Sequence, residues 1–231
     1  MIKKFADNFW VAEDDKFSVG GLQIGSRMTI IRLNNGGLLI HSPIPLSKTI
    51  KDSIASIGPP KFVIAPNTIH NMFVKQFHDE YPDAELYIVQ ELRKKRHDLF
   101  FAKDLANELI YPWSEEIKQH AVAVMGIPKL GEFVFFHSSS KTLILTDLAF
   151  YITPEKPLFT RLLFHLNGVY DKFGPSRIFK NFILKDKSEF EKSIDYILGW
   201  DFERIIIAHG RIVEKDGKGI FKEAFNSLLK T

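Results

Sequence analysis

Short apolar runs bounded by turn residues recur along the chain and predict β-strands. Two of these runs, Met28–Leu33 and Leu38–His41, flank the turn sequence Asn34–Gly37. An Asn-Gly pair between two apolar runs is a strong signal for a β-hairpin. Apolar residues at helical spacing begin soon afterwards in the segment Ser47–Ile57, where Ser47 suits the N-cap position. The pattern therefore predicts a hairpin followed by a helix in this part of the chain.

Predicted strands and helices alternate along most of the remaining sequence. We expect further strands at Asn8–Ala12, Lys61–Ala65, Glu85–Val89, His120–Met125, Glu132–His137, Lys141–Thr146 and Arg204–Ala208. We expect further helices at Asn71–Glu80, Glu91–Asp98, Pro157–Val169, Ser188–Gly199 and Gly219–Leu229. A mixture of hairpins and βα units occurs in two successive parts of the chain. This pattern indicates β-sheets flanked by helices. No glycine-rich phosphate loop follows any predicted strand, so nucleotide binding is not supported.

The composition limits the chemistry that the chain offers. With 231 residues, of which 45% are apolar and 21 are phenylalanine, the chain is able to bury a sizeable core. It has no cysteine, which excludes disulfides, thiolate zinc sites and cysteine nucleophiles. The net charge of +3 is too small to favour nucleic acid, and the basic cluster Arg93–Arg96 is typical of a solvated helix face. No apolar run suits a signal peptide or a membrane-spanning helix, so we expect a cytoplasmic protein.

Three predicted strands each lead to a side chain that is able to bind a metal. These side chains are His70, Asp147 and His209. Open sheets gather their ligand sites at the carboxyl ends of strands, so we expect the three side chains to face a common point. In a chain without cysteine, a metal must be held by histidine and carboxylate, with asparagine or water as further donors.

Four segments together resemble the metallo-β-lactamase-like fold, an α/β (α+β) protein built as a four-layer αββα sandwich with a metal site between two β-sheets. Ala65–His70 lies where that family has its H-x-H-x-D-H motif. Thr142–Phe150 is similar to the segment L-F-T-G-D-x-L-F, which carries the bridging aspartate, and Ile207–Gly210 is similar to the P-G-H-G loop, which carries the last histidine ligand. Gly37–Ser42 resembles the strand that ends in an aspartate behind the metals. Their order and spacing imply one domain over residues 1–231.

The chain departs from the family motif at several ligand positions. We align His70 with the final histidine of H-x-H-x-D-H. The other three metal-binding positions of that motif are then Ala65, Asn67 and Ile69. The complete set of motifs resembles an uncharacterised subfamily of the fold with a degenerate metal-binding motif.

Two further family positions also differ. The third histidine of the first metal site would fall near Ile127–Lys129, where the chain has no histidine, and His41 occupies the position of the aspartate behind the metals. All three histidines of the first site are therefore missing. Because His70, His209 and the shared Asp147 remain, the resemblance implies one altered site and not a dinuclear zinc centre.

Two imidazoles and one carboxylate suit a single zinc ion or Fe(II). The resemblance then implies a metal-dependent hydrolase with an at most mononuclear site, acting on an ester, thioester or phosphodiester. We expect catalytic roles for Asp147 and His137, and we expect His41 and Asn67 to line the same cleft or to contact the ligands. The substrate would be a small molecule that the sequence does not identify.

The same residues allow an interpretation without metal. Asp147 is able to pair with His70 or His209 in a buried hydrogen-bonded network, and Asn67 is able to bond to the local backbone. The protein would then be a non-catalytic binding module, or pseudoenzyme, that keeps the fold and uses the old cleft for a small ligand or a partner protein. The apolar segment Pro157–Leu166 is the candidate contact of a homodimer.

Overall fold

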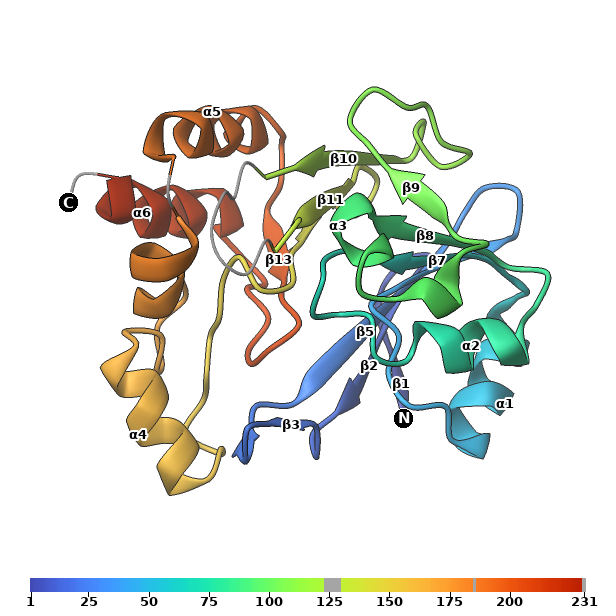
Figure 1. Cartoon of the computed structure of the whole chain (residues 1–231), viewed down its shortest axis with the longest axis horizontal. Helices are drawn as coiled ribbons and strands as arrows, with labels where there is room; N and C mark the ends of the chain where they lie inside the picture. Colours follow the sequence, from blue (N-terminus) through green and yellow to red (C-terminus); the bar gives the residue numbers. More distant parts are fainter. Residues whose placement is uncertain (123–129, 185, 230–231) are drawn as a thin grey trace.

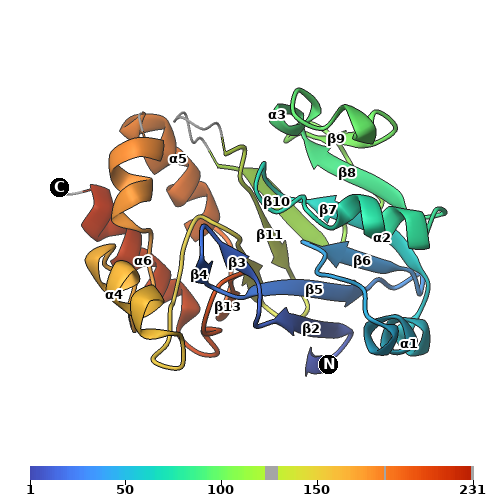
Figure 2. The ribbon, with the colours of Figure 1, turned by 60° about the horizontal axis from the view of Figure 1, so that its bottom comes forward.

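Two β-sheets lie face to face at the centre of the molecule, and helices cover the outer face of each sheet (Figures 1 and 2). The computed structural model describes residues 1–122, 130–184 and 186–229. Within these residues the chain forms a seven-stranded sheet, a four-stranded sheet and a two-stranded hairpin. This arrangement confirms the four-layer αββα fold that the sequence predicts.

The seven-stranded sheet has an antiparallel half and a parallel half. Its strands lie in the order β1 (Ile2–Ala6), β2 (Phe9–Asp14), β5 (Ser26–Arg32), β6 (Leu38–His41), β7 (Pro60–Ala65), β8 (Glu85–Val89) and β9 (Lys103–Leu105). Pairing is antiparallel from β1 to β6 and parallel from β6 to β9. The predicted hairpin is formed by β5 and β6, which pair Thr29 with His41.

The four-stranded sheet carries two of the candidate ligands. Its strands lie in the order β10 (Ile117–Ala121), β11 (Phe133–His137), β12 (Thr142–Ile144) and β13 (Arg204–Ile206). The first three strands pair antiparallel, whereas β12 and β13 run parallel, with Ile144 opposite Ile206. The carboxyl ends of β12 and β13 therefore lie at the same edge of the sheet.

Helices form the two outer layers. The seven-stranded sheet is covered by α1 (Lys48–Ile57), α2 (Val74–Glu80) and α3 (Gln90–Arg93), and the four-stranded sheet by α5 (Lys187–Leu198) and α6 (Gly217–Leu229). The N-cap of α1 is Ser47, as predicted, and its Oγ accepts a hydrogen bond from the backbone N–H of Ile50 at 3.3 Å. Because a helix leaves its first N–H groups without intrahelical partners, this bond stabilises the start of α1.

Smaller elements lie beside the candidate ligands Asp147 and His209. They are the hairpin of β3 (Ser18–Val19) and β4 (Leu22–Gln23), the helix α4 (Leu158–Leu166) and a π-helical turn at Phe179–Ile183. A 3₁₀ turn at His97–Leu99 follows α3.

None of the helices that the structure describes has both the length and the apolar character that a membrane span requires.

Alternate residues of β11 face two different cores. Phe133 and Phe135 pack with the apolar residues of the seven-stranded sheet, whereas Val134 and Phe136 pack with residues of α5 and α6 such as Phe190. Successive side chains of a strand point to opposite faces, and both faces of this strand are covered. The strand therefore reads as an uninterrupted apolar run, which is typical of strands that are buried on both sides.

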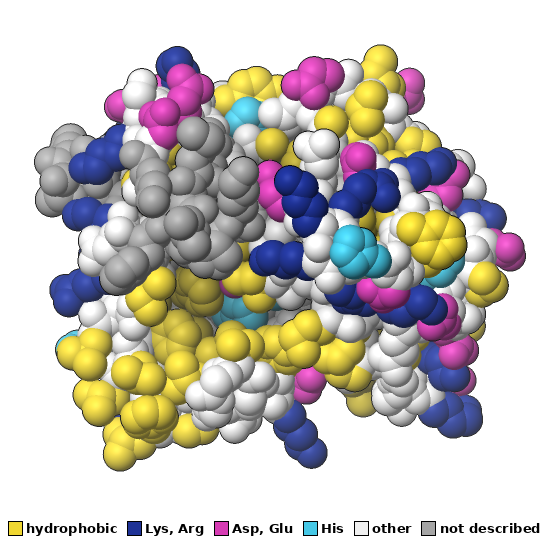
Figure 3. All heavy atoms as spheres, in the orientation of Figure 1, with side chains coloured by type: hydrophobic (Ala, Val, Ile, Leu, Met, Phe, Trp, Pro, Cys, Tyr) yellow, Lys and Arg dark blue, Asp and Glu magenta, His cyan; other side chains and the backbone are white. Residues whose placement is uncertain are grey.

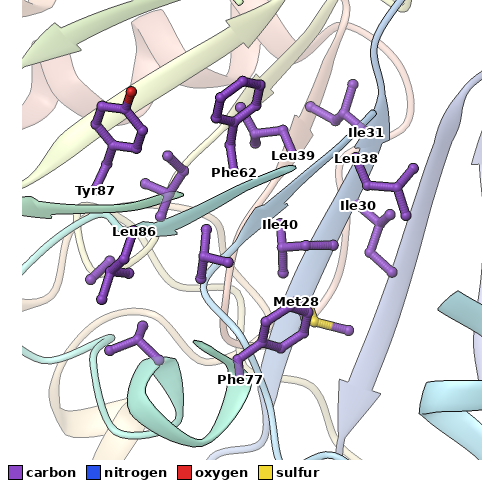
Figure 4. Close-up of a cluster of buried hydrophobic side chains, with 14 of the residues drawn as sticks. Met28, Ile30, Ile31, Leu38, Leu39, Ile40, Phe62, Phe77, Leu86 and Tyr87 are labelled. Atoms are coloured by element: carbon purple, nitrogen blue, oxygen red, sulfur yellow. The ribbon is translucent and has the colours of Figure 1, made fainter. Parts of the chain in front are cut away.

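The seven-stranded sheet is also buried on both faces. In Figure 4, Phe77 of α2 points toward Ile40 on one face of the sheet, while Phe62 and Tyr87 project from the other face. The ring centroid of Phe62 lies 5.1 Å from that of Trp113, which is fully buried. Burial of aromatic rings of this size makes a large contribution to the stability of the domain.

The sequence pattern predicts most of these elements to within a few residues. Its errors lie at element ends and in short elements: α2 begins at Val74 and not at Asn71, and the edge strands β1 and β9, the β3–β4 hairpin and the π-helical turn are not predicted. β10 begins at Ile117, and the predicted continuation of this strand to Met125 extends beyond the described residues. Edge strands escape the pattern because one of their sides is solvated and their residues are less apolar.

Candidate metal centre

Three predicted ligands meet at one edge of the sandwich. The Nε2 atom of His70 lies 3.1 Å from Nε2 of His209. Each of these nitrogens lies 3.4 Å from a different carboxylate oxygen of Asp147. All three side chains are largely buried. We call His70, Asp147 and His209 the triad. Among the described residues, these three form the group of histidine and acidic side chains whose spacing suits a metal ion.

Strand pairing brings two members of the triad together. β12 and β13 are parallel neighbours, with Ile144 opposite Ile206. Asp147 follows Ile144 by three residues, and His209 follows Ile206 by three residues. The equal offset beyond a matched register places the two side chains beside each other at the carboxyl ends of the strands, where open sheets form their ligand sites.

The third member reaches the same place from the other sheet. The segment that follows β7 is joined to the residues around the start of β11 by two backbone hydrogen bonds. The N–H of Thr68 donates to the carbonyl of Leu130 at 2.9 Å, and the N–H of Phe133 donates to the carbonyl of Pro66 at 2.9 Å. These bonds fix the turn that carries His70 against the four-stranded sheet.

The ring of His209 is held in one orientation. Its Nδ1 donates a hydrogen bond of 2.6 Å to the carbonyl oxygen of Gly25. In the neutral ring, Nε2 therefore presents its lone pair to the triad, as a metal-binding histidine does. The rings of Phe150 and Phe17 stack against the imidazole, with centroids at 5.4 Å and 6.3 Å. Hydrogen bonding and stacking together fix the direction of the donor atom.

A buried arginine and a glycine stabilise the loop after β13. The guanidinium of Arg27, of which only 7% is exposed, donates to the carbonyls of Ile207 and Gly210 and pairs with Glu13 at 2.6 Å. Gly210 has a φ of +99°, and a Cβ built there would lie 1.9 Å from the carbonyl oxygen of Tyr151. The close approach of two backbones therefore requires glycine at this position.

Two side chains position His70. Its Nδ1 lies 2.7 Å from Oγ of Ser42, and its backbone N–H donates to Oδ1 of Asn67 at 2.7 Å. Ser42 itself has a φ of +54°, and its N–H donates to the carbonyl of Ile64. With the proton of Nδ1 directed to the serine oxygen, Nε2 is the atom that faces the other members of the triad.

The side-chain amide of Asn67 is completely buried and fully bonded. Its Oδ1 accepts hydrogen bonds from two backbone N–H groups of the following turn, at 2.8 Å and 2.7 Å. Its Nδ2 donates to Oε2 of Glu132 and to Oδ2 of Asp147, each at 2.7 Å, and lies 3.0 Å from Oγ1 of Thr146. The residue directs N–H groups and not an oxygen lone pair toward Asp147, so Asn67 acts as a support and not as a metal ligand.

Glu132 is a site residue that the sequence interpretation misses. It is completely buried, and its Oε1 accepts hydrogen bonds from the backbone N–H of Thr146 at 2.8 Å and from the Thr146 hydroxyl at 2.6 Å. Together with the bond from Asn67, these contacts hold the turn that presents Asp147. A charged residue directly before the apolar run Phe133–Phe136 is the signal that could have drawn attention to it, since a buried carboxylate needs partners.

The triad has a defined distribution of charge. Burial favours the neutral form of Asp147, but the charge of His70 and hydrogen bonds with both histidines lower the pKa of this carboxyl well below its ordinary value. Burial likewise disfavours the charged form of His70, but Asp147 and Glu132 outweigh it and raise the pKa of His70. Burial is the main reason that the pKa of His209 is lowered. The favoured state is a carboxylate beside one charged and one neutral imidazole.

The geometry also fits a single cation. Ligand atoms about 2.1 Å from a tetrahedral zinc ion lie about 3.4 Å from one another. In the triad the two Nε2 atoms are 3.1 Å apart and each lies 3.4 Å from a different oxygen of Asp147, and one ligand atom from each of the three residues lies within 4.8 Å of the other two. Two imidazole nitrogens and one carboxylate are also the donor types that zinc and iron bind without thiolates. The residues present therefore fit one ion.

Of the remaining predicted residues, His41 lies in the interior and Asn67 supports the triad. His41 is 2% exposed, and its ring packs edge-on against Phe135 with a centroid distance of 5.1 Å. Burial, together with the charge of His70, lowers the pKa of His41 to about 3. His41 is thus a neutral residue behind the triad, and it does not line a cleft.

The structure does not bring His137, for which a catalytic role was predicted, to the triad. This residue pairs with Thr142 at the beginning of β12, whereas Asp147 follows the end of that strand. Five residues separate the two positions, which is on the order of 15 Å at the rise of an extended chain. The His137 ring instead lies in a turn, with Nδ1 2.8 Å from Ser140 Oγ and Nε2 3.1 Å from Ser139 Oγ. Because β11 and β12 are antiparallel, the carboxyl end of β11 lies at the opposite end of the strands from the carboxyl end of β12.

Comparison with known proteins identifies the family. A family model described as "Domain of unknown function (DUF4336)" matches residues 6–170, which is more than half of the chain. The chain belongs to this family. The matched residues of this DUF4336 member include His70 and Asp147 and end before His209. No curated protein matches the sequence.

Solved structures show that this DUF4336 member has the metallo-β-lactamase fold. The DIM-1 metallo-β-lactamase aligns with 100% of the chain and 96% of its own length, with a TM-score of 0.66 and 14% identity. A metallo-β-lactamase from Pontibacter korlensis aligns over 100% and 99%, with a TM-score of 0.63 and 10% identity. The Flv1 flavodiiron core from Synechocystis sp. PCC6803 aligns with 100% of this chain and 60% of its own length, with a TM-score of 0.69 and 13% identity. The predicted resemblance in fold is confirmed.

Substitution of Gly210 tests the loop that carries His209. Gly210→Ala is expected to lower the free energy of unfolding by more than ~2 kcal/mol, because the new Cβ meets a backbone carbonyl and the positive φ adds strain. Gly36→Ala is the matched control, since Gly36 has a φ of +83° and open space around it. Urea denaturation measures both variants, and equal losses would show that the contact with Tyr151 is unimportant.

Substitution of Glu132 tests the buried support of Asp147. Glu132→Gln replaces one accepting oxygen by an N–H₂ group that faces hydrogen-bond donors, so a loss of ~1–3 kcal/mol in the free energy of unfolding is expected. Glu116→Gln is the control, because Glu116 accepts a backbone N–H near the surface and surface changes stay within ~0.5 kcal/mol. A Glu132→Gln protein as stable as the control would contradict the assigned role.

The environment of His137 predicts a dependence of stability on pH. Burial lowers the pKa of His137 to about 4, whereas an unfolded histidine titrates near pH ~6.5. Between these values the unfolded chain binds a proton that the folded chain does not, so stability is full above pH ~6.5 and falls as the pH decreases toward about 4. The unfolding free energy of His137→Gln should fall less steeply across this window.

The measurement is chemical denaturation at several pH values with a chelator present. His97→Gln is the matched control variant, because His97 is an exposed histidine. Parallel curves for wild type and His137→Gln would show that His137 is not the group responsible.

Proposed function

We propose that the protein is a metal-dependent hydrolase whose triad holds one divalent cation. The observation that carries the proposal is the spacing of the three donor groups, with the histidine Nε2 atoms 3.1 Å apart and each 3.4 Å from an oxygen of Asp147. Zinc and Fe(II) both accept two imidazoles and a carboxylate and keep further positions open. The tautomer of His209, set by the Gly25 carbonyl, directs a lone pair to the proposed ion.

The chemistry of such a site combines the cation with the surrounding protein groups. A divalent cation supplies Lewis acidity, which makes water nucleophilic near neutral pH and polarises a carbonyl or phosphoryl oxygen. Asn67 holds Oδ2 of Asp147 by a hydrogen bond, which keeps the carboxylate in one orientation toward the two histidines. Phe17 and Phe150 flank His209 and reduce the access of bulk water to the donor atoms.

A site for one cation is favoured over a site for two. The family's first site would require donors at Ala65 and Asn67, but alanine offers none and the amide of Asn67 is fully used. Ile69 stands at the aspartate position of the second site. The FIM-1 metallo-β-lactamase from Pseudomonas aeruginosa, solved in a mono-zinc form, aligns with the whole chain at a TM-score of 0.64 and 9% identity. That structure supports a single zinc ion in this fold.

A metal-free binding module is the alternative, and one observation favours it. A charged His70 beside the carboxylate of Asp147 and the neutral ring of His209 forms a hydrogen-bonded cluster that needs no cation. A proton would then take the place of the metal, and the cleft would bind a ligand without chemistry. The two functions differ in what the triad binds, so metal content distinguishes them.

Metal analysis of protein prepared without a histidine tag tests the proposal. We expect close to one equivalent of zinc or iron in the wild type and a loss of at least tenfold in His70→Ala and His209→Ala, because each variant removes one of three donors. His165→Ala is the matched control, since His165 is an exposed histidine on α4. Elemental analysis gives the metal content of each protein.

Thermal denaturation with added zinc provides a second readout. A ligand at about 100 times its Kd stabilises the folded state by ~2.7 kcal/mol, so zinc should raise the Tm of the wild type and the control but not that of the His209→Ala protein. Background metal in the wild type, unchanged in His70→Ala, would favour the binding module and overturn the hydrolase.

A further inference from the structure

An apolar pocket opens directly onto the triad. Its volume is about 330 Å³, and Asp147 and His209 form part of its wall. Its other wall residues include members of the β3–β4 hairpin, α4 and the π-helical turn, together with Leu130, Ile69 and Phe150. Pockets that bind small molecules begin at about 300 Å³. The pocket is therefore large enough for one small ligand in contact with the proposed metal ligands.

The wall of this pocket carries almost no charge. Apart from Asp147 and His209, its polar members are the neutral side chains of Asn167 and Ser176, and no lysine or arginine is among them. The remaining residues are aliphatic or aromatic, such as Phe17, Phe150 and Leu163. Because burying an uncompensated charge against such a wall is costly, the part of a ligand that enters the pocket must be neutral and apolar.

The mouth of the pocket is also apolar. Val19, Ile69 and Ile178 line it and are exposed by 46%, 41% and 53%. In Figure 3, hydrophobic side chains gather over α4 and continue toward a hollow in which a histidine is visible. Exposed apolar side chains that surround a pocket mark a binding site for an apolar partner. A long apolar group entering the pocket would therefore cover these side chains as well.

We infer that the pocket binds the hydrocarbon chain of a neutral carboxylic ester or thioester whose acyl carbon lies at the triad. Each methylene occupies roughly the ~30 Å³ that a water molecule takes in the liquid, so the pocket holds a chain of about ten carbons. This inference rests on the proposed function for the reaction, but chain binding itself needs no metal.

The reaction is a hydrolysis without other reactants. Water adds to the acyl carbon, and the bond from this carbon to the alcohol oxygen or thiol sulfur breaks. The leaving group takes one proton of the water, and the second proton is released from the carboxylic acid. The apolar wall positions the chain so that the acyl carbon lies beside Asp147 and His209.

Titration of metal-stripped protein with octan-1-ol tests chain binding separately from catalysis. We expect saturable binding to the wild type by calorimetry, with no detectable binding of ethanol. Leu163→Lys should weaken octan-1-ol binding at least tenfold, because it places an ammonium group in the apolar wall. Leu162→Lys is the matched control: Leu162 is the preceding residue of α4, is 54% exposed and does not line the pocket, so its affinity should change less than twofold.

The outcomes separate the pocket from the hydrolase. Absence of saturable binding, or equal weakening by Leu163→Lys and Leu162→Lys, would overturn the inference, because the alcohol would then bind elsewhere or to the outer face of α4. Octan-1-ol binding to a protein that takes up no metal would support the pocket and contradict only the hydrolase. With metal bound, hydrolysis of p-nitrophenyl octanoate at least tenfold faster than of the acetate is expected, and equal rates would contradict the chain specificity.

Discussion

The primary amide of Asn67 joins the parts of the site that come from different sheets. Its oxygen accepts two backbone N–H groups of the turn that carries His70, and its nitrogen donates to Glu132 and Asp147. Two buried carboxylates close together repel each other and need donors between them. A histidine that bound a metal here could not donate to both carboxylates. The presence of asparagine thus converts a position that holds metal in the wider fold into a structural support for the remaining donors.

This support explains how the triad keeps its geometry without a second metal. The parallel pair β12 and β13 sets the relative position of Asp147 and His209, and the Asn67 amide adds His70 from the other sheet. The three donors are therefore held by strand register and by buried hydrogen bonds that exist in the absence of an ion. Preorganisation of this kind lowers the entropic cost of binding, whether the occupant is a cation or a proton.

Much of the fold can be read from the sequence, because strands buried on both faces, such as Phe133–Phe136, are uninterrupted apolar runs. The convergence of the triad follows from the order of its motifs along the chain. Glu132 could not be found in this way, since its partner Asn67 is 65 residues distant in sequence and their contact depends on how the sheets face each other. The position of His137 could have been predicted, because the turn Ser138–Lys141 already implies an antiparallel hairpin that places it away from Asp147.

The residues that surround the triad come from elements outside the sandwich. The β3–β4 hairpin, α4 and the π-helical turn belong to none of the four layers, yet each supplies residues to the wall of the apolar pocket. The layers fix the positions of the triad, and these peripheral elements form part of the pocket beside it. The matched family region ends at residue 170, before both the π-helical turn and His209. His209 and part of the pocket wall are thus contributed by the same C-terminal portion of the chain, beyond the matched region.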